Sequence, residues 1–300
     1  MAHELTACFV GLGSIGRRHL KNLKAVCDER GIAVSIDALR HAPGDLPPDV
    51  WHLVRRSYLA ADELPHYDVA FICNPSQVHY ETLLALNAKA DRLFVEKPVF
   101  VRPLADSRME PFADERKHYV ACPLRHSRTF ASISEFVRKN RIYSVRALCS
   151  SYLPGWRPGQ DYRQLYCARR ESGGVALDLI HEFDYLFSLF GFPLQASLFA
   201  RKVSALEIDS PDVVSFAAAY EGMTAEVHLD YFGRTPQRYC ELFAENETAR
   251  FDFLGASEDR NEGYLREMRY FLDFALDGRA NINSVAFANK VLRIVMGGLA

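Results

Sequence analysis

Short apolar runs alternate with amphipathic stretches through the first 122 residues. The apolar runs have the length of buried strands and cover residues 7–10, 33–39, 68–73, 93–95 and 119–122. Between them, residues 17–29 carry Leu20, Leu23 and Val26 at helical spacing, and residues 79–90 form a second, Leu/Ala-rich helical stretch. Strands that alternate with helices predict a parallel sheet with crossover helices.

The pattern changes after Pro123. A helix is expected near residues 130–139, a strand at 144–151, and an apolar helix that ends at residue 190. Alternating strands follow at 196–203, 213–220, 224–231 and 238–244, and helices return at 264–276 and 284–296. We therefore expect an α/β chain of two domains. Residues 1–122 form the first, and residues 123–300 form an α+β domain whose sheet is open and largely antiparallel.

Composition narrows the class of protein. A length of 300 residues fits two domains, and a net charge of −2 gives no bulk attraction to nucleic acid or an anionic membrane. Seven cysteines without a CxxC pair predict no disulfide framework and no metal site, and Cys8 and Cys73 lie in apolar runs as buried thiols would. Without a signal peptide or a run of about 20 apolar residues, a reducing cytoplasmic compartment is expected.

A glycine loop joins the first strand to the first helix. Gly11, Gly13 and Gly16 have the spacing of a dinucleotide-binding loop, in which they permit a tight turn, close approach of a pyrophosphate and close packing of helix on strand. Ser14 and Ile15 complete the loop, and the helix N-terminus favours phosphate charge. The alternative is a tight turn without a ligand.

The end of the second strand indicates the cofactor. An acid there would bind the ribose 2′-hydroxyl of NAD, but Asp37 falls within the strand and the strand ends at Leu39, Arg40 and His41. Arg40 suits a 2′-phosphate, so NADP is favoured over NAD. A solvated arginine at the strand end is the alternative.

Polar residues also follow the strands predicted at residues 68–73 and 93–95. Asn74, Pro75 and His79 come after residues 68–73, where a loop can face a cofactor or simply turn. Glu96 and Lys97, followed by Pro98, come after residues 93–95. A lysine at the mouth of a nucleotide cleft can act on a hydroxyl. The alternative is an exposed loop lysine without a catalytic role.

An apolar stretch from Gly173 to Asp184 contains an acid, an imidazole and another acid. If it is helical, Asp178, His181 and Asp184 are spaced by three and lie on one side. They indicate either a site or a His–Asp pair that holds the helix in place.

The chain resembles the glucose–fructose oxidoreductase and inositol dehydrogenase family, Gfo/Idh/MocA, over about residues 5–190. The matching residues are Gly11-Leu12-Gly13-Ser14-Ile15-Gly16, Asn74-Pro75 with His79, Glu96-Lys97-Pro98, and Gly173-Gly174 with Asp178, His181 and Asp184. The resemblance implies a Rossmann domain, a second domain that binds substrate and often forms the dimer face, and hydride transfer between a nicotinamide and a secondary alcohol. It places Lys97, His181 and Asp178 around the reacting hydroxyl. Family members usually separate the acid and the histidine by four residues, whereas three separate them here, which leaves the role of Asp178 less defined.

A loop before the Asp–His stretch is similar to members of the family found in bacterial surface-sugar pathways. Trp156 and Tyr162 offer aromatic faces for a pyranose, and Arg157 and Arg163 offer guanidinium forks for a carboxylate or diphosphate. Arg125 is a further substrate-binding candidate, and Asp184 is another. The alternative is a packed loop whose arginines pair with local acids.

These residues predict an NAD(P)-dependent dehydrogenase or reductase acting on a sugar, nucleotide sugar or sugar acid. A homodimer or homotetramer through the C-terminal sheet is expected. Two rivals remain: a glycosidase that uses NAD for transient oxidation, and a non-catalytic dinucleotide sensor. The intact pair of Lys97 and His181 argues against the sensor.

Overall fold

Two compact units make up the chain. The structure, a computed structural model, describes residues 4–171, 173–255 and 260–297. The first unit comprises Met1–Phe100, Leu104–Pro123 and Arg260–Asn289, and the second comprises Val101–Pro103, Leu124–Asp259 and Lys290–Ala300.

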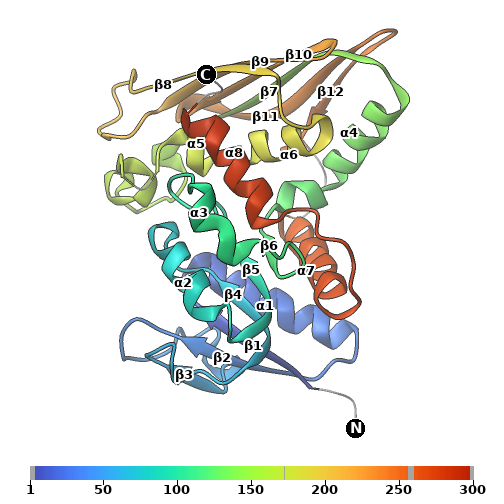
Figure 1. The fold of residues 1–300 in the computed structure, drawn as a ribbon. Coiled ribbons are helices and arrows are strands. Elements are labelled where there is room, and N and C mark those ends of the chain that lie inside the picture. The colour runs from blue at the N-terminus through green and yellow to red at the C-terminus, as the bar shows by residue number, and fades with distance from the viewer. Residues whose placement is uncertain (1–3, 172, 256–259, 298–300) are drawn as a thin grey trace. The chain divides into compact units, whose positions relative to one another are not determined.

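A six-stranded parallel sheet forms the centre of the first unit (Figure 1). Its strands are β1 (Leu5–Val10), β2 (Val34–Leu39), β3 (Arg56–Tyr58), β4 (Tyr67–Ile72), β5 (Ala90–Val95) and β6 (His118–Val120). The order β3-β2-β1-β4-β5-β6, with every neighbouring pair parallel, is that of a dinucleotide-binding Rossmann fold. The predicted fold class is confirmed. The pattern of apolar residues missed β3 because this edge strand is short and polar.

Helices cover this sheet. They are α1 (Ser14–Glu29), α2 (His79–Leu86), α3 (Asp106–Met109), α7 (Arg260–Leu276) and the start of α8 (Val285–Gly297), with short 3₁₀ turns at Trp51–Leu53, Ser76–Val78 and Glu110–Phe112. Leu20, Leu23 and Val26 on α1 are fully buried, as their spacing predicts.

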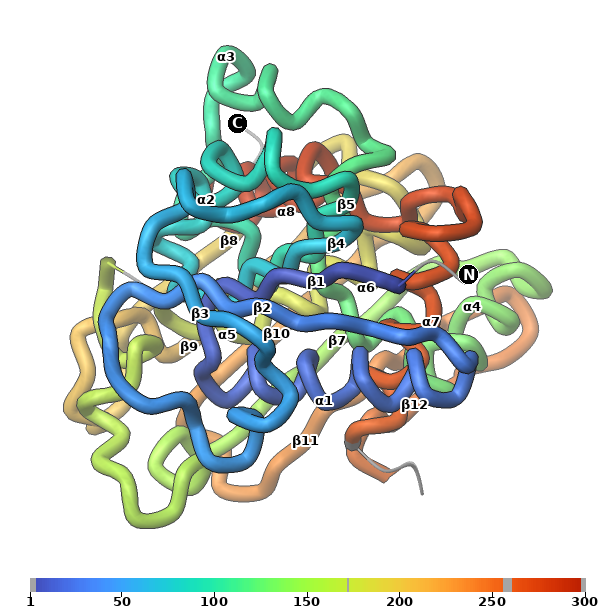
Figure 2. Tube along the Cα trace, turned by 90° about the horizontal axis from the view of Figure 1, so that it is seen from below, coloured from blue at the N-terminus to red at the C-terminus, as the bar shows by residue number. Residues whose placement is uncertain are grey.

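Helix α7 returns from late in the sequence to pack beside α1 (Figure 2). The amides of Asn22 and Asn261 exchange hydrogen bonds of 3.2 and 3.0 Å. Phe271 packs edge-on against Phe71 and Phe94, with ring centroids 5.3 and 5.2 Å away. The boundary expected at residue 123 assigned this helix to the second domain. Its buried face instead completes the core of the first unit.

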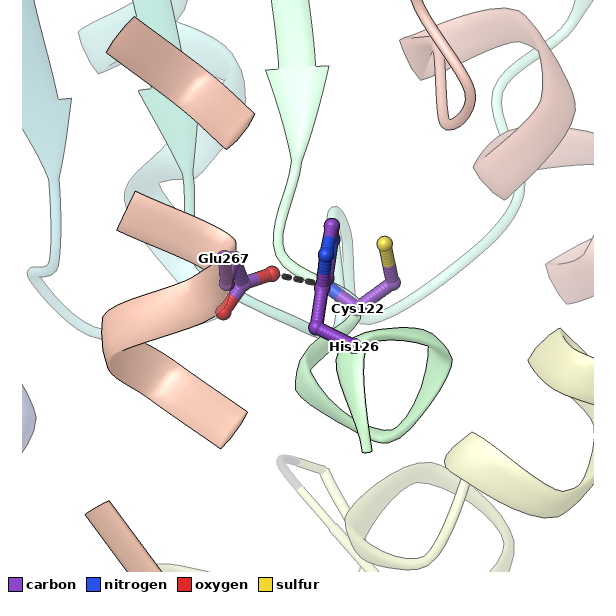
Figure 3. A group of neighbouring side chains, drawn as sticks. All are labelled: Cys122, His126 and Glu267. Atoms are coloured by element: carbon purple, nitrogen blue, oxygen red, sulfur yellow. Dashed lines mark hydrogen bonds between the residues drawn. The ribbon is translucent and has the colours of Figure 1, made fainter. Parts of the chain in front are cut away.

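A buried glutamate ties α7 to the end of β6 (Figure 3). Glu267 is fully buried, and its Oε1 accepts hydrogen bonds from the Cys122 amide at 2.6 Å and from the Tyr119 hydroxyl at 3.1 Å. Charged groups are buried only where donors compensate them, so this contact fixes the position of α7 on the sheet.

The second unit contains a six-stranded mixed sheet. Its strands are β7 (Ile142–Tyr152), β8 (Gln195–Arg201), β9 (Val213–Tyr220), β10 (Met223–Asp230), β11 (Phe232–Ala244) and β12 (Thr248–Asp252), in the order β12-β11-β7-β10-β9-β8. Only β7 and β10 run parallel; the other neighbours are antiparallel. The largely antiparallel sheet was predicted, although β12 was not.

Helices pack on one face of the second sheet (Figure 1). They are α4 (Arg128–Lys139), α5 (Val175–Asp178) and α6 (His181–Phe190), with 3₁₀ turns at Pro123–His126, Leu153–Gly155, Tyr162–Gln164 and Tyr166–Ala168. The strands alternate buried and exposed positions, so the opposite face carries exposed side chains such as Phe199. All seven cysteines are buried and free. Within the described ranges, no helix is long and apolar enough to cross a membrane.

Candidate functional site

The glycine loop has the geometry that close packing of α1 on the sheet requires. Gly11 adopts a φ of +90°, which L side chains rarely do, and a Cβ there would lie 2.7 Å from the Asn74 nitrogen. A Cβ on Gly16 would lie 2.0 Å from the Gly11 carbonyl oxygen. A Cβ on Gly13 would meet nothing within 4 Å. The packing of the protein itself therefore requires Gly11 and Gly16 to lack a side chain, whereas the space around Gly13 is open.

The N-terminus of α1 fits an anionic ligand. Gly13 is its N-cap, no side chain caps it, and no acidic residue lies in the first turn. A 16-residue helix with an uncapped start presents partial positive charge to a phosphate. Leu12 and Ile15 pack their side chains against the core, so they would contribute main-chain groups, whereas Ser14 is exposed.

The end of β2 carries a base and no accessible acid. Asp37 is fully buried, paired with both Nε and Nη2 of Arg55 at 3.0 and 2.8 Å, and accepts a hydrogen bond from the Tyr67 hydroxyl at 2.9 Å. Arg40 donates to the carbonyl oxygens of Gly44 and Asp45 at 2.6 and 3.1 Å. Asp37 is thus committed inside the unit, and Arg40 is engaged by its own loop.

The loop after β4 is held by a buried histidine. The two ring nitrogens of His79 lie 2.9 Å from the Asn74 carbonyl oxygen and 3.1 Å from that of Val99. Burial lowers the pKa of His79, although the two carbonyls favour the charged form. Pro75 caps the following 3₁₀ turn. His79 therefore joins two loops through its ring nitrogens, which favours a structural role over direct contact with a cofactor.

Asn74 itself keeps an acceptor available. Its Nδ2 donates to the Thr82 hydroxyl at 2.7 Å. Its Oδ1 is buried and has no hydrogen-bond partner among the residues that the structure describes. A buried acceptor of this kind is costly unless a ligand group donates to it, and Asn74 adjoins Gly11. Asn74 and the glycine loop are therefore neighbouring candidates for one ligand site.

Glu96 and Lys97 follow β5. Glu96 is buried and accepts hydrogen bonds from His19 Nε2 at 2.5 Å and from the Lys97 amide at 3.0 Å. Lys97 is half-buried. His19 lies on α1, so the helix that follows the glycine loop is joined directly to the segment carrying Lys97.

The Asp–His stretch is not one helix. α5 ends at Asp178, Leu179 leaves the helical region with φ −99° and ψ 30°, and α6 begins at His181. The single helix expected from the spacing is therefore wrong, because the chain bends between the two residues. Asp178 and His181 are both buried.

Aromatic side chains surround Asp178. The Tyr166 hydroxyl donates to Asp178 Oδ1, and the Tyr231 hydroxyl donates to Oδ2 at 3.4 Å. Burial, together with the neighbouring carboxylate, raises the pKa of Tyr231 well above its usual value, so Tyr231 remains a donor. Trp156 packs edge-on against Tyr231 at 5.3 Å. The second unit therefore brings Asp178 and Trp156 into one cluster.

Two buried ion pairs hold α6. The Arg125 guanidinium grips both carboxylate oxygens of Asp184 at 2.8 and 2.7 Å, with both side chains nearly buried. Arg238 of β11 grips fully buried Glu182 at 2.6 and 3.0 Å. Since Arg125 and Asp184 neutralise each other, their arrangement supports a structural role for both.

The arginines of the loop predicted to bind substrate have different surroundings. Arg163 pairs with Asp161 and Glu207 at 2.8 and 3.0 Å on the surface, and the Tyr162 hydroxyl accepts from the Glu207 amide. Arg163 thus matches the alternative of local pairing. Arg157 is exposed.

Sequence reasoning missed several residues of these clusters. Tyr166, Tyr231 and Arg238 lie 12 to 56 positions from the acids they contact, and nothing in the sequence connects them. His19 had a signal, since it is a polar residue four positions before Leu23 on the buried stripe of α1.

Comparison with curated proteins gives distant relatives. A myo-inositol 2-dehydrogenase from Thermotoga maritima is 29% identical over 194 residues, which cover 61% of this chain and 54% of the relative. An uncharacterized oxidoreductase from Bacillus subtilis is 26% identical over 204 residues, covering 64% and 55%. The chain thus matches about half the length of these relatives.

Solved structures match the fold over nearly the whole chain. Myo-inositol 2-dehydrogenase from Lactobacillus plantarum superimposes with a TM-score of 0.78 at 18% identity, covering 98% of this chain and 95% of that one. A levoglucosan dehydrogenase solved with NADH and levoglucosan gives a TM-score of 0.81 at 15% identity, with the same coverage. The family model that describes the Gfo/Idh/MocA oxidoreductase family, NAD-binding Rossmann fold, matches residues 5–122. Residues 5–122 therefore match the Gfo/Idh/MocA oxidoreductase family, and the solved structures share the fold of nearly the whole chain.

Proposed function

We propose that this protein is an NAD(P)-dependent dehydrogenase or reductase acting on the CH–OH group of a sugar, nucleotide sugar or sugar acid. One observation carries the proposal. The glycine loop, the open N-terminus of α1 and the segment bearing Lys97 belong to one unit and are joined through His19 and Glu96. A dinucleotide loop coupled in this way to a lysine suits redox chemistry at an alcohol carbon.

The dinucleotide would be held by main-chain groups of the loop and α1 and by the Asn74 side chain. When bound, the nicotinamide accepts or donates the hydride. NADP is favoured over NAD because the residue that follows β2 is Arg40, and no accessible acid lies at this strand end.

Lys97, His181 and Asp178 are proposed to act on the substrate hydroxyl. Oxidation of an alcohol requires removal of its proton, and an ordinary histidine has a pKa of about 6.5, which suits proton transfer near neutrality. His181 would take this proton and Lys97 would stabilise the developing negative charge. Asp178, held by two tyrosine hydroxyls, would orient the substrate.

Sugars are supported as substrates by the aromatic cluster around Asp178. Trp156 and Tyr231 provide the kind of surface that packs against a pyranose, and exposed Arg157 can reach an anionic substituent. Two of the similar proteins are named for myo-inositol and levoglucosan, which are polyhydroxylated rings.

Assembly and location complete the proposal. The exposed face of the second sheet is hollowed by about 450 Å³, and its lining combines Phe199 and small side chains with the ion pair of Arg146 and Glu226. Such a face supports a homodimer or homotetramer through this sheet. Seven buried free thiols are compatible with a reducing, cytoplasmic compartment.

A substrate screen tests the function. Cyclitols, sugars, nucleotide sugars and sugar acids are mixed with NAD⁺ or NADP⁺, and reduction is followed by nicotinamide absorbance. His181→Ala and Lys97→Ala should each lose about 10²- to 10⁴-fold in turnover while dinucleotide affinity stays nearly unchanged. Full activity of both variants on a true substrate would remove the proposed mechanism. Absence of dinucleotide binding by calorimetry would remove the function, and retention of NAD through purification together with glycoside cleavage would favour the glycosidase.

A further inference from the structure

A buried histidine on α1 contacts the segment that carries Lys97. His19 is completely buried three residues after Gly16. Its ring packs against Phe94 at 4.7 Å and edge-on against Tyr264 at 5.9 Å. These contacts fix the ring, so the direction in which its Nε2 points is set by packing.

The two ring nitrogens of His19 have different surroundings. Nε2 lies 2.5 Å from Glu96 Oε1, whereas Nδ1 is buried without a hydrogen-bond partner among the described residues. A carboxylate oxygen can only accept, so Nε2 is the ring nitrogen through which His19 donates to Glu96.

The Glu96 carboxylate connects His19 to the main chain of Lys97. Its Oε1 accepts from His19 and its Oε2 accepts from the Lys97 amide at 3.0 Å. Although burial opposes the charged form, the hydrogen bond and charge of His19 and the charge and amide of Lys97 hold the pKa of Glu96 below its ordinary value. A buried carboxylate with two fixed donors holds the groups that it joins in place. We call this contact of His19, Glu96 and the Lys97 amide the clamp.

The other titratable groups facing Glu96 do not compete for its charge. Burial raises the pKa of Cys73 and of Tyr264, and the nearby Glu96 raises both further. Burial lowers the pKa of His79. All three are thus neutral near pH 7, which leaves His19 and Lys97 as the groups that stabilise the carboxylate.

We propose that His19 is a positioning residue that sets the placement of Lys97 through the Glu96 carboxylate. This rests on the proposed function, in which Lys97 acts on the substrate hydroxyl. Because His19 lies on the helix that begins at the glycine loop, one hydrogen-bonded chain of atoms runs from the dinucleotide-binding helix to the main chain of Lys97. A small displacement of a reacting group can cost about 10²-fold in rate, so this chain matters for turnover.

An experiment without substrate tests the clamp. Lys97 is the only lysine that follows a glutamate in the sequence. Protein made with ¹³C-carbonyl glutamate and ¹⁵N-lysine therefore gives a single amide signal, that of Lys97, in a carbonyl-filtered NMR spectrum. In His19→Leu this signal should move, and its pH titration, which follows Glu96, should shift upward by about one pH unit or more. His19→Gln, whose amide can still donate, should restore most of the wild-type behaviour.

A matched control separates this effect from general loss of packing. His118 is another buried histidine of the first unit, hydrogen-bonded to Asn87 at 2.9 Å. His118→Gln should leave the Lys97 signal and its titration in place. An unchanged Lys97 signal in His19→Leu would overturn the proposal. If His19→Leu does not fold, His19→Asn, whose side chain is too short to reach Glu96, takes its place.

A double-mutant cycle on turnover tests the consequence. With the best substrate of the screen, His19→Leu should lower kcat about ten- to a hundredfold with less than about threefold change in dinucleotide affinity. In a Lys97→Ala background it should cause no further loss. An additive loss would overturn the role of His19 while leaving the proposed function intact. Full activity of Lys97→Ala would instead overturn the proposed catalytic role of Lys97, and the NMR result would still decide whether the contact through Glu96 exists.

Discussion

Two alanine substitutions in the glycine loop should have opposite consequences. Gly16→Ala places a methyl group 2.0 Å from the Gly11 carbonyl oxygen and 3.2 Å from the Cys73 Cβ, far inside ordinary contact distance. Relieving this overlap moves α1 away from the sheet, at a cost of about 3 kcal/mol. The better helix propensity of alanine returns only ~1 kcal/mol. We expect a net loss of about 2 kcal/mol, or a fall in Tm of about 4–8 °C.

Gly13→Ala adds the same methyl group where nothing lies within 4 Å. The backbone of Gly13, with φ −68° and ψ −172°, is accessible to any residue. A gain of ~0.4–1 kcal/mol from the less flexible unfolded chain is offset by the weaker N-cap, so stability should stay within about 0.5 kcal/mol of wild type. Dinucleotide binding should nevertheless weaken about 10- to 100-fold, because the methyl group occupies the space through which a pyrophosphate approaches the main chain.

Thermal unfolding by circular dichroism and calorimetric titration with NAD⁺ and NADP⁺ measure both effects on the same samples. Wild-type affinity in Gly13→Ala would show that the pyrophosphate does not approach this main chain. An unchanged Tm in Gly16→Ala would refute the packing argument, and a large loss of stability in Gly13→Ala would refute the separation of the two roles.

Three further predictions concern the cofactor and stability. NADP⁺ should bind more tightly than NAD⁺, and Arg40→Ala should remove roughly 1.5–3 kcal/mol of that preference; equal affinities in calorimetry would dismiss Arg40. Burial lowers the pKa of His118 to about 4, so as the pH falls His118 is protonated in the unfolded chain before it is protonated in the folded chain. Stability that is present above pH ~6.5 is therefore lost as the pH falls. Urea unfolding should show about 2 kcal/mol of this loss between pH 7 and pH 5, and an equal loss in His118→Gln would contradict it. Arg238→Met should lower the free energy of unfolding by about 3–5 kcal/mol, because Glu182 is left buried and unpaired; a loss below about 1 kcal/mol would show that the pair is not buried in solution.

The sequence predicted the first sheet and its loop well, because both are local patterns. A strand, three glycines and an amphipathic helix specify a βα turn without reference to the rest of the chain, and Gly11 has the positive φ that this turn requires. Asp37 was correctly placed within the strand for the same reason. Elements whose periodicity is strong were found, and the short polar strand β3 was not.

Features that depend on distant partners could not be predicted. Leu179 and Ile180 contain no helix-breaking residue, so the bend between Asp178 and His181 is set by tertiary packing. Arg125 and Asp184 each had the chemistry of a substrate-binding residue, and only the fold shows that they neutralise each other. The partner of an amphipathic helix is likewise absent from its own pattern, which is why α7 was assigned to the second domain although it packs in the first unit.

The return of α7 has a consequence for how the chain matures. Its residues Met268 and Phe271 are fully buried in the core of the first unit, which also contains Leu20 and Phe71 from the first quarter of the chain. On the ribosome, the dinucleotide-binding unit therefore emerges almost entirely before the helix that completes it, and the whole second sheet is synthesised in between. A nascent chain stalled at residue 122 would expose this apolar surface to chaperones, so the unit gains its final stability only late in translation.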